Sequence, residues 1–206
     1  MTGILVVTSV EAEQAAFERG LPSSARGSVT VLVGGVGSAA VAVTTAVALA
    51  RQSFRLVLSA GLGGAFDGAA RIGGLLLADR IVAADLGADG PEGFLSVEEL
   101  GFGRTTFEAT AVPGLDAAVG DLLTVNTATG TAGGCARLRA AHPKAVGEAM
   151  EGYGVAVAAS RFGVPFAEVR AVSNLIGPRD RSAWRIGDAL AALTRAAPRI
   201  VEGLLP

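Results

Sequence analysis

Residues 29–51 read VTVLVGGVGSAAVAVTTAVALAR, and this stretch decides how the chain folds. Its first five residues are leucine or β-branched and predict a strand over residues 29–33. The glycines at 34–37 predict a tight turn, and the alanine-rich run 38–51 predicts a buried helix. The uncharged residues 27–50 are long enough to cross a bilayer, but the glycines interrupt their centre. The stretch therefore predicts strand, turn and helix rather than a membrane span.

The same alternation of strands and helices continues on both sides of this stretch. Short apolar runs predict further strands over residues 4–8, 55–59, 75–84, 121–126, 145–150 and 166–173. Amphipathic runs predict helices over residues 11–19, 135–142, 151–162 and 184–205. Residues 60–64 predict a turn, and the polar residues 85–103 predict a long loop. The pattern predicts an α/β fold in three layers, α/β/α, with helices on both faces of the sheet.

Length, composition and charge limit the classes of function. The 206 residues fit one domain spanning residues 1–206, and half of them are hydrophobic, enough for a sizeable core. A net charge of −2 gives no general attraction to nucleic acid or to an anionic membrane. One cysteine, Cys135, cannot form an internal disulfide, and no targeting segment is visible, so we expect a cytoplasmic protein. One histidine, His142, excludes a multi-histidine metal site, and no metal is predicted.

Polar residues and glycines gather where the predicted strands end. In open α/β sheets, small ligands bind beyond the carboxyl ends of the strands. The clusters are residues 9–13, 34–38, 60–64, 126–131, 150–151 and 173–174. Together they indicate a small-molecule site, independently of any single motif.

The glycine turn allows more than one interpretation. Gly35-x-Gly37-x-x-Ala40 matches the relaxed dinucleotide-binding fingerprint in a strand–turn–helix context. That fingerprint requires an acidic residue near the end of the next strand, and residues 55–59 contain none. The turn otherwise brings the backbone close to an anion or a substrate edge, or it simply packs a strand tightly on a helix.

Three carboxylates follow predicted strands. Glu11 and Glu13 are candidates for a general base beneath a substrate. Glu151 is a candidate for accepting two hydrogen bonds from a ribose diol. Acidic residues in the first turn of a helix also complement its dipole, which is the structural alternative for all three.

Asn174 ends the apolar strand of residues 166–173. Its amide offers an acceptor and a donor, which match a protonated N7 and the O6 of a 6-oxopurine, whereas an aspartate would suit a 6-aminopurine. A turn-forming asparagine is the alternative. Beyond it, Arg179 and Arg181 either clamp an anionic part of a substrate or form a surface pair with Asp180.

Motifs in a fixed order resemble the nucleoside phosphorylase and nucleosidase superfamily over nearly the whole chain. They are Val10-Glu11-Ala12-Glu13, Gly61-Leu62-Gly63-Gly64, Ala149-Met150-Glu151-Gly152 and Val172-Ser173-Asn174. The methylthioadenosine/S-adenosylhomocysteine nucleosidases carry Ser-Asp at the last of these. Residues 83–88, 91–94, 100–103, 123–125, 129–131 and 173–180 more closely resemble the futalosine hydrolases. That family hydrolyses futalosine to hypoxanthine and dehypoxanthine futalosine in a pathway of menaquinone biosynthesis.

The resemblance implies a mixed, twisted central sheet of the phosphorylase/hydrolase type and a reaction without a cofactor. It implies that Glu13 activates the attacking water, although a misalignment by one helical turn would exchange it with Glu11. It further implies that Met150 packs against the ribose, that Glu151 holds the ribose hydroxyls, and that Asn174 binds N7 and O6 of the leaving base.

The remaining implied contacts concern the base. Leu62 and Gly63 would supply backbone contacts to it. Thr129 stands where the methylthioadenosine enzymes carry an aromatic residue that stacks on the purine. Phe94 or a residue of a second subunit would then supply the stacking. The resemblance also suggests a homodimer or a higher homo-oligomer.

Two other functions stay open at this point. A purine nucleoside phosphorylase acting on 6-oxopurine nucleosides needs phosphate beside the ribose. No arginine lies at residues 34–37 or near Glu13, and the Glu13 carboxylate would repel phosphate. A non-catalytic purine-binding module would have no need of a carboxylate under C1′, so Glu13 is also the discriminating residue for that alternative.

Overall fold

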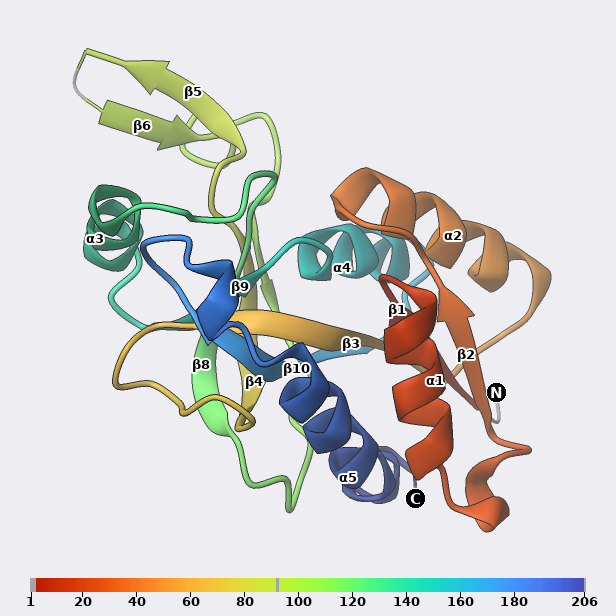
Figure 1. Ribbon diagram of the computed structural model, residues 1–206. Coiled ribbons are helices and arrows are strands. Elements are labelled where there is room, and N and C mark those ends of the chain that lie inside the picture. Colours follow the sequence, from red (N-terminus) through yellow and green to blue (C-terminus); the bar gives the residue numbers. More distant parts are fainter. Residues whose placement is uncertain (1–2, 92, 206) are drawn as a thin grey trace.

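The computed structural model describes residues 3–91 and 93–205 (Figure 1). Strand β1 (Ile4–Thr8) is buried at every position, as its unbroken apolar run predicts for a strand covered on both faces. β2 (Val29–Val33) and β3 (Leu56–Ala65) both pair with β1 in parallel. Because these three strands are parallel, their carboxyl ends lie at the same edge of the sheet.

β3 is the strand on which the rest of the sheet is built. On one edge it pairs in parallel with β10 (Phe166–Leu175). On the other edge it pairs with β1 through residues 56–59, and then antiparallel with β9 (Ala145–Ala149) through residues 64–65. That edge therefore changes neighbours partway along the strand.

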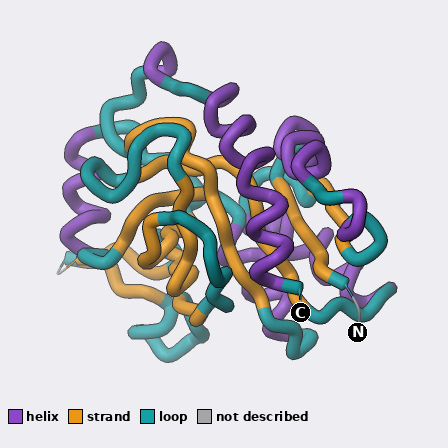
Figure 2. Tube along the Cα trace, turned by 90° about the horizontal axis from the view of Figure 1, so that it is seen from below, coloured by secondary structure: helices purple, strands orange, loops and turns teal. Residues whose placement is uncertain are grey.

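The sheet closes on itself at its far side. β4 (Leu75–Ala83) pairs with β10 and with β8 (Ala118–Thr124), and β8 pairs with β9. Since β9 and β10 both pair with β3, these strands form a closed ring, which Figure 2 shows as a curl of orange strands. The short β7 (Thr106–Glu108) adds to β4 outside the ring.

Helices cover the two faces of the open part of the sheet (Figure 1). α1 (Glu11–Gly20) packs beside α5 (Ile186–Leu204), and α2 (Ser38–Arg51) packs beside α4 (Gly152–Arg161). Alternate side chains of β1 sort between them: Ile4 and Val6 belong to the core under α1 and α5, Leu5 and Val7 to the core under α2 and α4. α3 (Ala132–Ala141) lies apart, near the ring.

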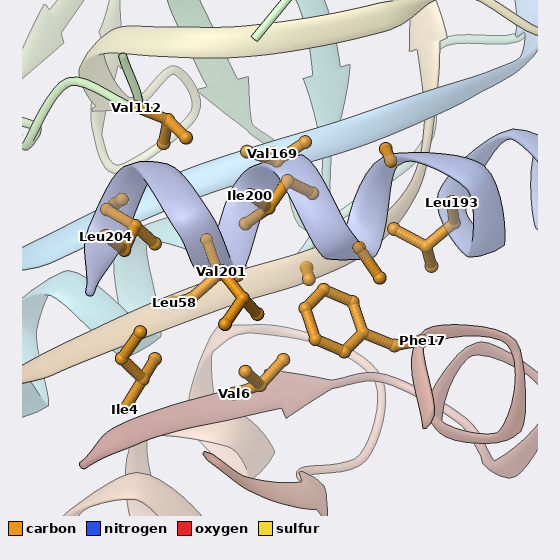
Figure 3. Close-up of a cluster of buried hydrophobic side chains, with 14 of the residues drawn as sticks. Ile4, Val6, Phe17, Leu58, Val112, Val169, Leu193, Ile200, Val201 and Leu204 are labelled. Atoms are coloured by element: carbon orange, nitrogen blue, oxygen red, sulfur yellow. The ribbon is translucent and has the colours of Figure 1, made fainter. Parts of the chain in front are cut away.

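The best-developed core lies under α5. Its buried residues recur every three or four positions, which places them on one stripe of the helix. Figure 3 shows Leu193, Ile200 and Val201 from this stripe packed among Phe17 of α1 and Val169 of β10. This packing fixes α1, and with it the segment that follows β1, against the sheet.

The three-layer α/β fold with a mixed sheet is confirmed, and the predicted strands and helices are present with ends shifted by a few residues. The closing of the sheet into a ring was not predicted. The predicted turn at residues 60–64 is wrong, because these residues continue β3. Glycines normally favour turns, but here pairing with β10 keeps the segment extended.

The predicted long loop at residues 85–103 is only partly a loop. It contains a hairpin of β5 (Gly87–Gly90) and β6 (Gly93–Ser96), which extends away from the body (Figure 1); Glu92, part of one resemblance segment, lies outside the described residues. β7 and the short 3₁₀ turns Ser23–Ala25 and Arg181–Ala183 were also not predicted. Within residues 3–91 and 93–205, no helix has the length and apolarity needed to cross a membrane.

Candidate active site

A cavity of about 260 Å³ opens where β3 changes neighbours. Between residues 59 and 64, no strand of the described chain pairs with that edge of β3. The cavity lining draws on the predicted strand-end clusters, through Ser9, Glu13, Val36, Leu62, Gly63, Thr129, Met150, Glu151, Ser173 and Asn174. The sequence clusters therefore meet in one hollow, close to the lower end of the usual size of small-molecule sites.

Glu13 is buried in the first turn of α1, and its carboxylate reaches into the gap beside β3. Its Oε2 accepts hydrogen bonds from the N–H groups of Ser9 (2.8 Å) and Val10 (3.3 Å), and its Oε1 accepts one from the N–H of Leu62 (2.8 Å). A carboxylate has about four acceptor positions, so roughly one remains for the cavity. Glu11, by contrast, is exposed on α1.

Glu151 lies immediately before α4 and lines the same part of the cavity. Its Oε1 accepts from the N–H of Gly37 (3.2 Å), and the Ser38 hydroxyl donates to the carbonyl of Met150 (3.3 Å). Gly37 has φ +89°, in the left-handed region that favours glycine. The glycine turn thus packs closely on the Met150–Glu151 segment and orients it.

A buried guanidinium stands behind both carboxylates. Arg170 of β10 is 0% exposed; its Nε donates to Glu168 Oε1 (2.8 Å), one Nη donates to the Ser59 hydroxyl (2.7 Å), and the other lies 3.2 Å from Glu151 Oε2. Burial works against the charged guanidinium, but Glu168, Glu151 and Glu13 outweigh it and raise the pKa of Arg170. One cation therefore holds together carboxylates from three separate segments.

Glycines make room for this network. A Cβ on Gly61 would lie 2.7 Å from an Arg170 Nη and 2.8 Å from Glu13 Oε1, and a Cβ on Gly152 would overlap the Glu168 carboxylate. Glu168 Oε2 has no hydrogen-bond partner in the described structure, and burial raises the pKa of Glu168. Sequence reasoning gave Arg170 and Glu168 no role. The available signal was two charges, two residues apart, in an otherwise apolar strand.

Asn174 lines the cavity further along β3, opposite Gly64. A bulge at Ser173 shifts the register of β10 just before it, a common device for aiming a side chain at a site. The Ser173 hydroxyl donates to Asn174 Oδ1 (2.8 Å), and Nδ2 donates to the carbonyl of Leu175 (3.0 Å). One lone pair of Oδ1 and one N–H of Nδ2 remain, so the amide offers an acceptor and a donor.

Glu148 of β9 also lines the cavity, and sequence reasoning missed it. Its Oε1 accepts from the N–H of Thr129 (2.8 Å) and its Oε2 from the Thr129 hydroxyl (2.6 Å). Burial raises the pKa of Glu148, while the two bonds from Thr129 oppose that rise. Thr129 is thereby tied to Glu148. An acidic residue inside a buried apolar strand was the signal available in the sequence.

The structure places Phe94 away from the cavity. It lies on β6, 45% exposed, and lines a separate hollow beside His142, because the hairpin extends from the body of the molecule. The described chain therefore does not bring Phe94 to the cavity as a stacking residue. Leu62 lines the cavity, and its N–H donates to Glu13. Gly63 and Met150 line the cavity as expected.

The remaining rim comes from the segment after β10. Arg179 lines the cavity and places its guanidinium 5.5 Å from the ring centre of Trp184, a cation–π contact. Arg181 lies in the 3₁₀ turn beyond it. Within the described parts of the chain, no three His, Cys, Asp or Glu side chains come together as a metal site would require.

Comparisons with known proteins agree with this fold. The sequence matches the phosphorylase superfamily over residues 8–206. Two curated relatives, the futalosine hydrolases of Streptomyces coelicolor and Acidothermus cellulolyticus, are each 46% identical to it. These alignments cover 98% and 93% of this chain, and 96% and 87% of the relatives.

A solved structure extends the agreement to three dimensions. The 5′-methylthioadenosine/S-adenosylhomocysteine nucleosidase of Colwellia psychrerythraea, in complex with adenine, superposes with a TM-score of 0.81. The match covers 98% of this chain and 96% of that one at 17% identity. At this identity the likeness shows the fold.

Proposed function

Because the chain belongs to the phosphorylase superfamily and, within it, to the futalosine hydrolases, we propose that it hydrolyses the N-glycosidic bond of futalosine. The products are hypoxanthine and dehypoxanthine futalosine, in menaquinone biosynthesis. We propose one catalytic domain that works without a cofactor. The observation that carries the proposal is the buried Glu13 carboxylate, oriented by three backbone N–H groups beside the cavity.

We assign the attacking water to Glu13. N-glycosidic cleavage passes through an oxocarbenium-like state in which C1′ becomes positive. The water oxygen bonds to C1′ while its proton passes to Glu13, and the electron pair of the C1′–N9 bond leaves with the purine. The carboxylates around Arg170 outnumber its single positive charge, which favours a cationic transition state nearby.

We assign the sugar to Glu151 and Met150. The Glu151 carboxylate is fixed by Gly37 and Arg170, so it can accept hydrogen bonds from the ribose diol without first being ordered. The Met150 side chain lines the cavity beside it and provides apolar surface for the ribose.

We assign the leaving base to Asn174. Its Oδ1 accepts a bond from N7–H and its Nδ2 donates to O6, a pairing that suits hypoxanthine. The amide cannot give up a proton as an acid does; it stabilises a base whose N7 takes its proton from solvent. Gly63 and Thr129 border the base on the adjoining segments.

Phosphorolysis is the less favoured reaction. Arg170 lies close to Glu13, but its guanidinium is already engaged by Glu168, Ser59 and Glu151. A phosphate at the position of attack would meet the Glu13 carboxylate, beside a guanidinium that these partners already occupy. The geometry supports water as the nucleophile.

We propose that the protein acts in the cytoplasm as a homodimer or larger homo-oligomer. The cytoplasmic assignment rests on the single cysteine, which fits a reducing compartment. The hairpin and the residues on either side of it expose the apolar side chains of Leu86, Phe94, Leu95 and Phe102, the last at 84%. Neighbouring exposed apolar side chains are typical of contact surfaces, so we propose that a second subunit packs against this surface. Light scattering on the purified protein measures the mass of the assembly and so the number of subunits.

The test is base release followed by chromatography. Futalosine, inosine and methylthioadenosine are each incubated with the protein in phosphate-free buffer and then with phosphate. We expect hypoxanthine from futalosine at a rate independent of phosphate. Release that requires phosphate would make the protein a phosphorylase, binding of hypoxanthine without any release would make it a binding module, and release of adenine from methylthioadenosine would overturn the assignment of Asn174.

A further inference from the structure

Glu148 and Asn174 occupy matching positions on the two strands that flank β3. Gly64 of β3 pairs with Asn174 on β10 at one edge and with Glu148 on β9 at the other. Residues paired in register project to the same face of a sheet. Both side chains line the cavity, so they face the same space from opposite sides of Gly64.

Gly64 also lines the cavity, and Ile176 Cγ1 lies 3.0 Å from the position that a Cβ on Gly64 would take. Adjacent strands lie about 4.8 Å apart, so the backbones carrying Asn174 and Glu148 are separated by roughly twice that distance. Asn174 Nδ2 already lies 3.2 Å from the position a Cβ on Gly64 would take. A planar ring bound in the cavity between these two strands would therefore meet the amide on one edge and the carboxylate on the next.

Glu148 differs from the other carboxylates of the cavity. Glu151 contacts Arg170, and Glu13 lies close to it, whereas no ion pair among the described residues includes Glu148. Among the described residues, Thr129 alone donates side-chain or backbone hydrogen bonds to the Glu148 carboxylate, one to each oxygen, so acceptor positions remain on both. A buried carboxylate without a cation needs further donors, and burial raises its pKa accordingly.

A 6-oxopurine supplies such a donor. Its N7, O6 and N1–H follow one another along one edge of the ring. A base held at N7 and O6 by Asn174 turns N1–H toward the next side chain along the sheet. A 6-aminopurine has a lone pair at N1, which a carboxylate repels.

We propose that Glu148 accepts a hydrogen bond from N1–H of the leaving base and, together with Asn174, selects 6-oxopurines over 6-aminopurines. This inference rests on the proposed function, since it concerns the base of the same substrate. It gives Glu148 a specificity role in addition to its contact with Thr129.

The test compares Glu148→Gln with Glu98→Gln. Glu98 accepts bonds from the N–H and the hydroxyl of Thr105 (2.9 Å each), the same pair of contacts, but it lies outside the cavity. The measured quantity is kcat/KM for futalosine and for its counterpart with adenine in place of hypoxanthine. We expect Glu148→Gln to lower the preference for futalosine by about 10- to 100-fold, because a hydrogen bond involving a charged group is lost. Glu98→Gln should keep the wild-type ratio.

A second measurement isolates the N1 contact. The affinities of hypoxanthine and 1-methylhypoxanthine, which lacks N1–H, are measured by calorimetry or as product inhibition. The wild type should bind the methylated base about 10- to 100-fold more weakly, and Glu148→Gln should bind the two about equally.

The outcomes separate this inference from the proposed function. If Glu148→Gln lowers both kcat/KM values equally and keeps the preference for hypoxanthine over its methylated form, Glu148 only supports Thr129 and the inference is wrong. If the wild type releases no hypoxanthine from futalosine, the proposed function itself fails and the role of Glu148 falls with it.

Discussion

The two ends of the cavity are built in different ways. At the end assigned to the ribose, Glu13, Glu151 and Glu168 come from separate segments and share one buried guanidinium, Arg170. At the end assigned to the base, Asn174 is held by its sequence neighbours, and Glu148 by two hydrogen bonds from Thr129. A change at the first end therefore disturbs several elements at once, whereas a change at the second should alter which base is chosen and leave the fold intact.

The largest effect is expected at Glu13. Glu13→Gln removes the proton acceptor, and we expect kcat for futalosine hydrolysis to fall by about 100- to 10,000-fold, the usual contribution of a general base. The exposed Glu11 on the same helix provides the matched control, because Glu11→Gln should retain wild-type kcat. Steady-state kinetics of both variants, with folding checked by circular dichroism, measures this. Equal losses in the two variants would contradict the assignment.

Because Gly152 leaves room for the Glu168 carboxylate, we expect substitutions at these two residues to have coupled effects on the free energy of unfolding. Gly152→Ala places a methyl group in the space of the Glu168 carboxylate and should cost about 1–3 kcal/mol in the free energy of unfolding. In a Glu168→Ala background the same substitution should cost close to nothing, since the clash is gone. A double-mutant cycle by urea denaturation measures the coupling. Additive costs would show that the two residues do not share this space.

The base end should respond with altered selectivity. Asn174→Asp replaces the Nδ2 donor by a second carboxylate oxygen facing O6. We expect kcat/KM for futalosine to fall by about 10- to 100-fold and the preference to move toward the adenine counterpart. Asn174→Ala is the comparison, because it removes the amide without offering a new partner. If Asp and Ala give the same ratio between the two substrates, Asn174 does not read the base.

The smallest expected effect is on stability, at Glu148. Its folded-state pKa is raised by burial, so between the ordinary glutamate pKa and that raised value the folded state binds more protons than the unfolded state. The free energy of unfolding of the wild type therefore falls as pH rises through this window. Gln does not titrate, so Glu148→Gln should be slightly more stable at pH 7, with the advantage vanishing near the ordinary glutamate pKa. Thermal unfolding at both pH values tests this; a variant less stable at pH 7 would show that the carboxylate supports the fold.

Much of the fold could be predicted from the sequence, because apolar runs and the glycines between them determine strands, helices and turns through neighbouring residues. The gathering of polar residues at strand ends also brought Glu13, Glu151 and Asn174 into one cavity. The extension of β3 through residues 60–64 could not be predicted, because glycines carry a turn signal that only the pairing with β10 overrides. The closing of the sheet depends on such pairings between distant strands.

The supporting charges were missed for a related reason. Arg170 and Glu168 alternate with apolar residues, a pattern that also describes a strand with one face in solvent. In the three-dimensional structure that face is a buried polar network. Gly61 and Gly152 lack side chains that would otherwise collide with Arg170 and Glu168. Glu148 was missed likewise, since its partner Thr129 lies on another segment. Phe94 was misplaced because no local signal shows where a hairpin points.

Residues 60–63 of β3 pair with β10 on one edge, and on the other edge no strand of the described chain pairs with them, which has an evolutionary consequence. The N–H that holds Glu13 belongs to the backbone of Leu62, so a codon change at that position, short of proline, leaves the donor in place. The hydrogen bond that orients Glu13, the proposed water-activating group, thus depends on the backbone conformation of β3 and not on any one side chain. Lineages sharing this fold are free to diversify the side chains around the base while keeping the same anchor.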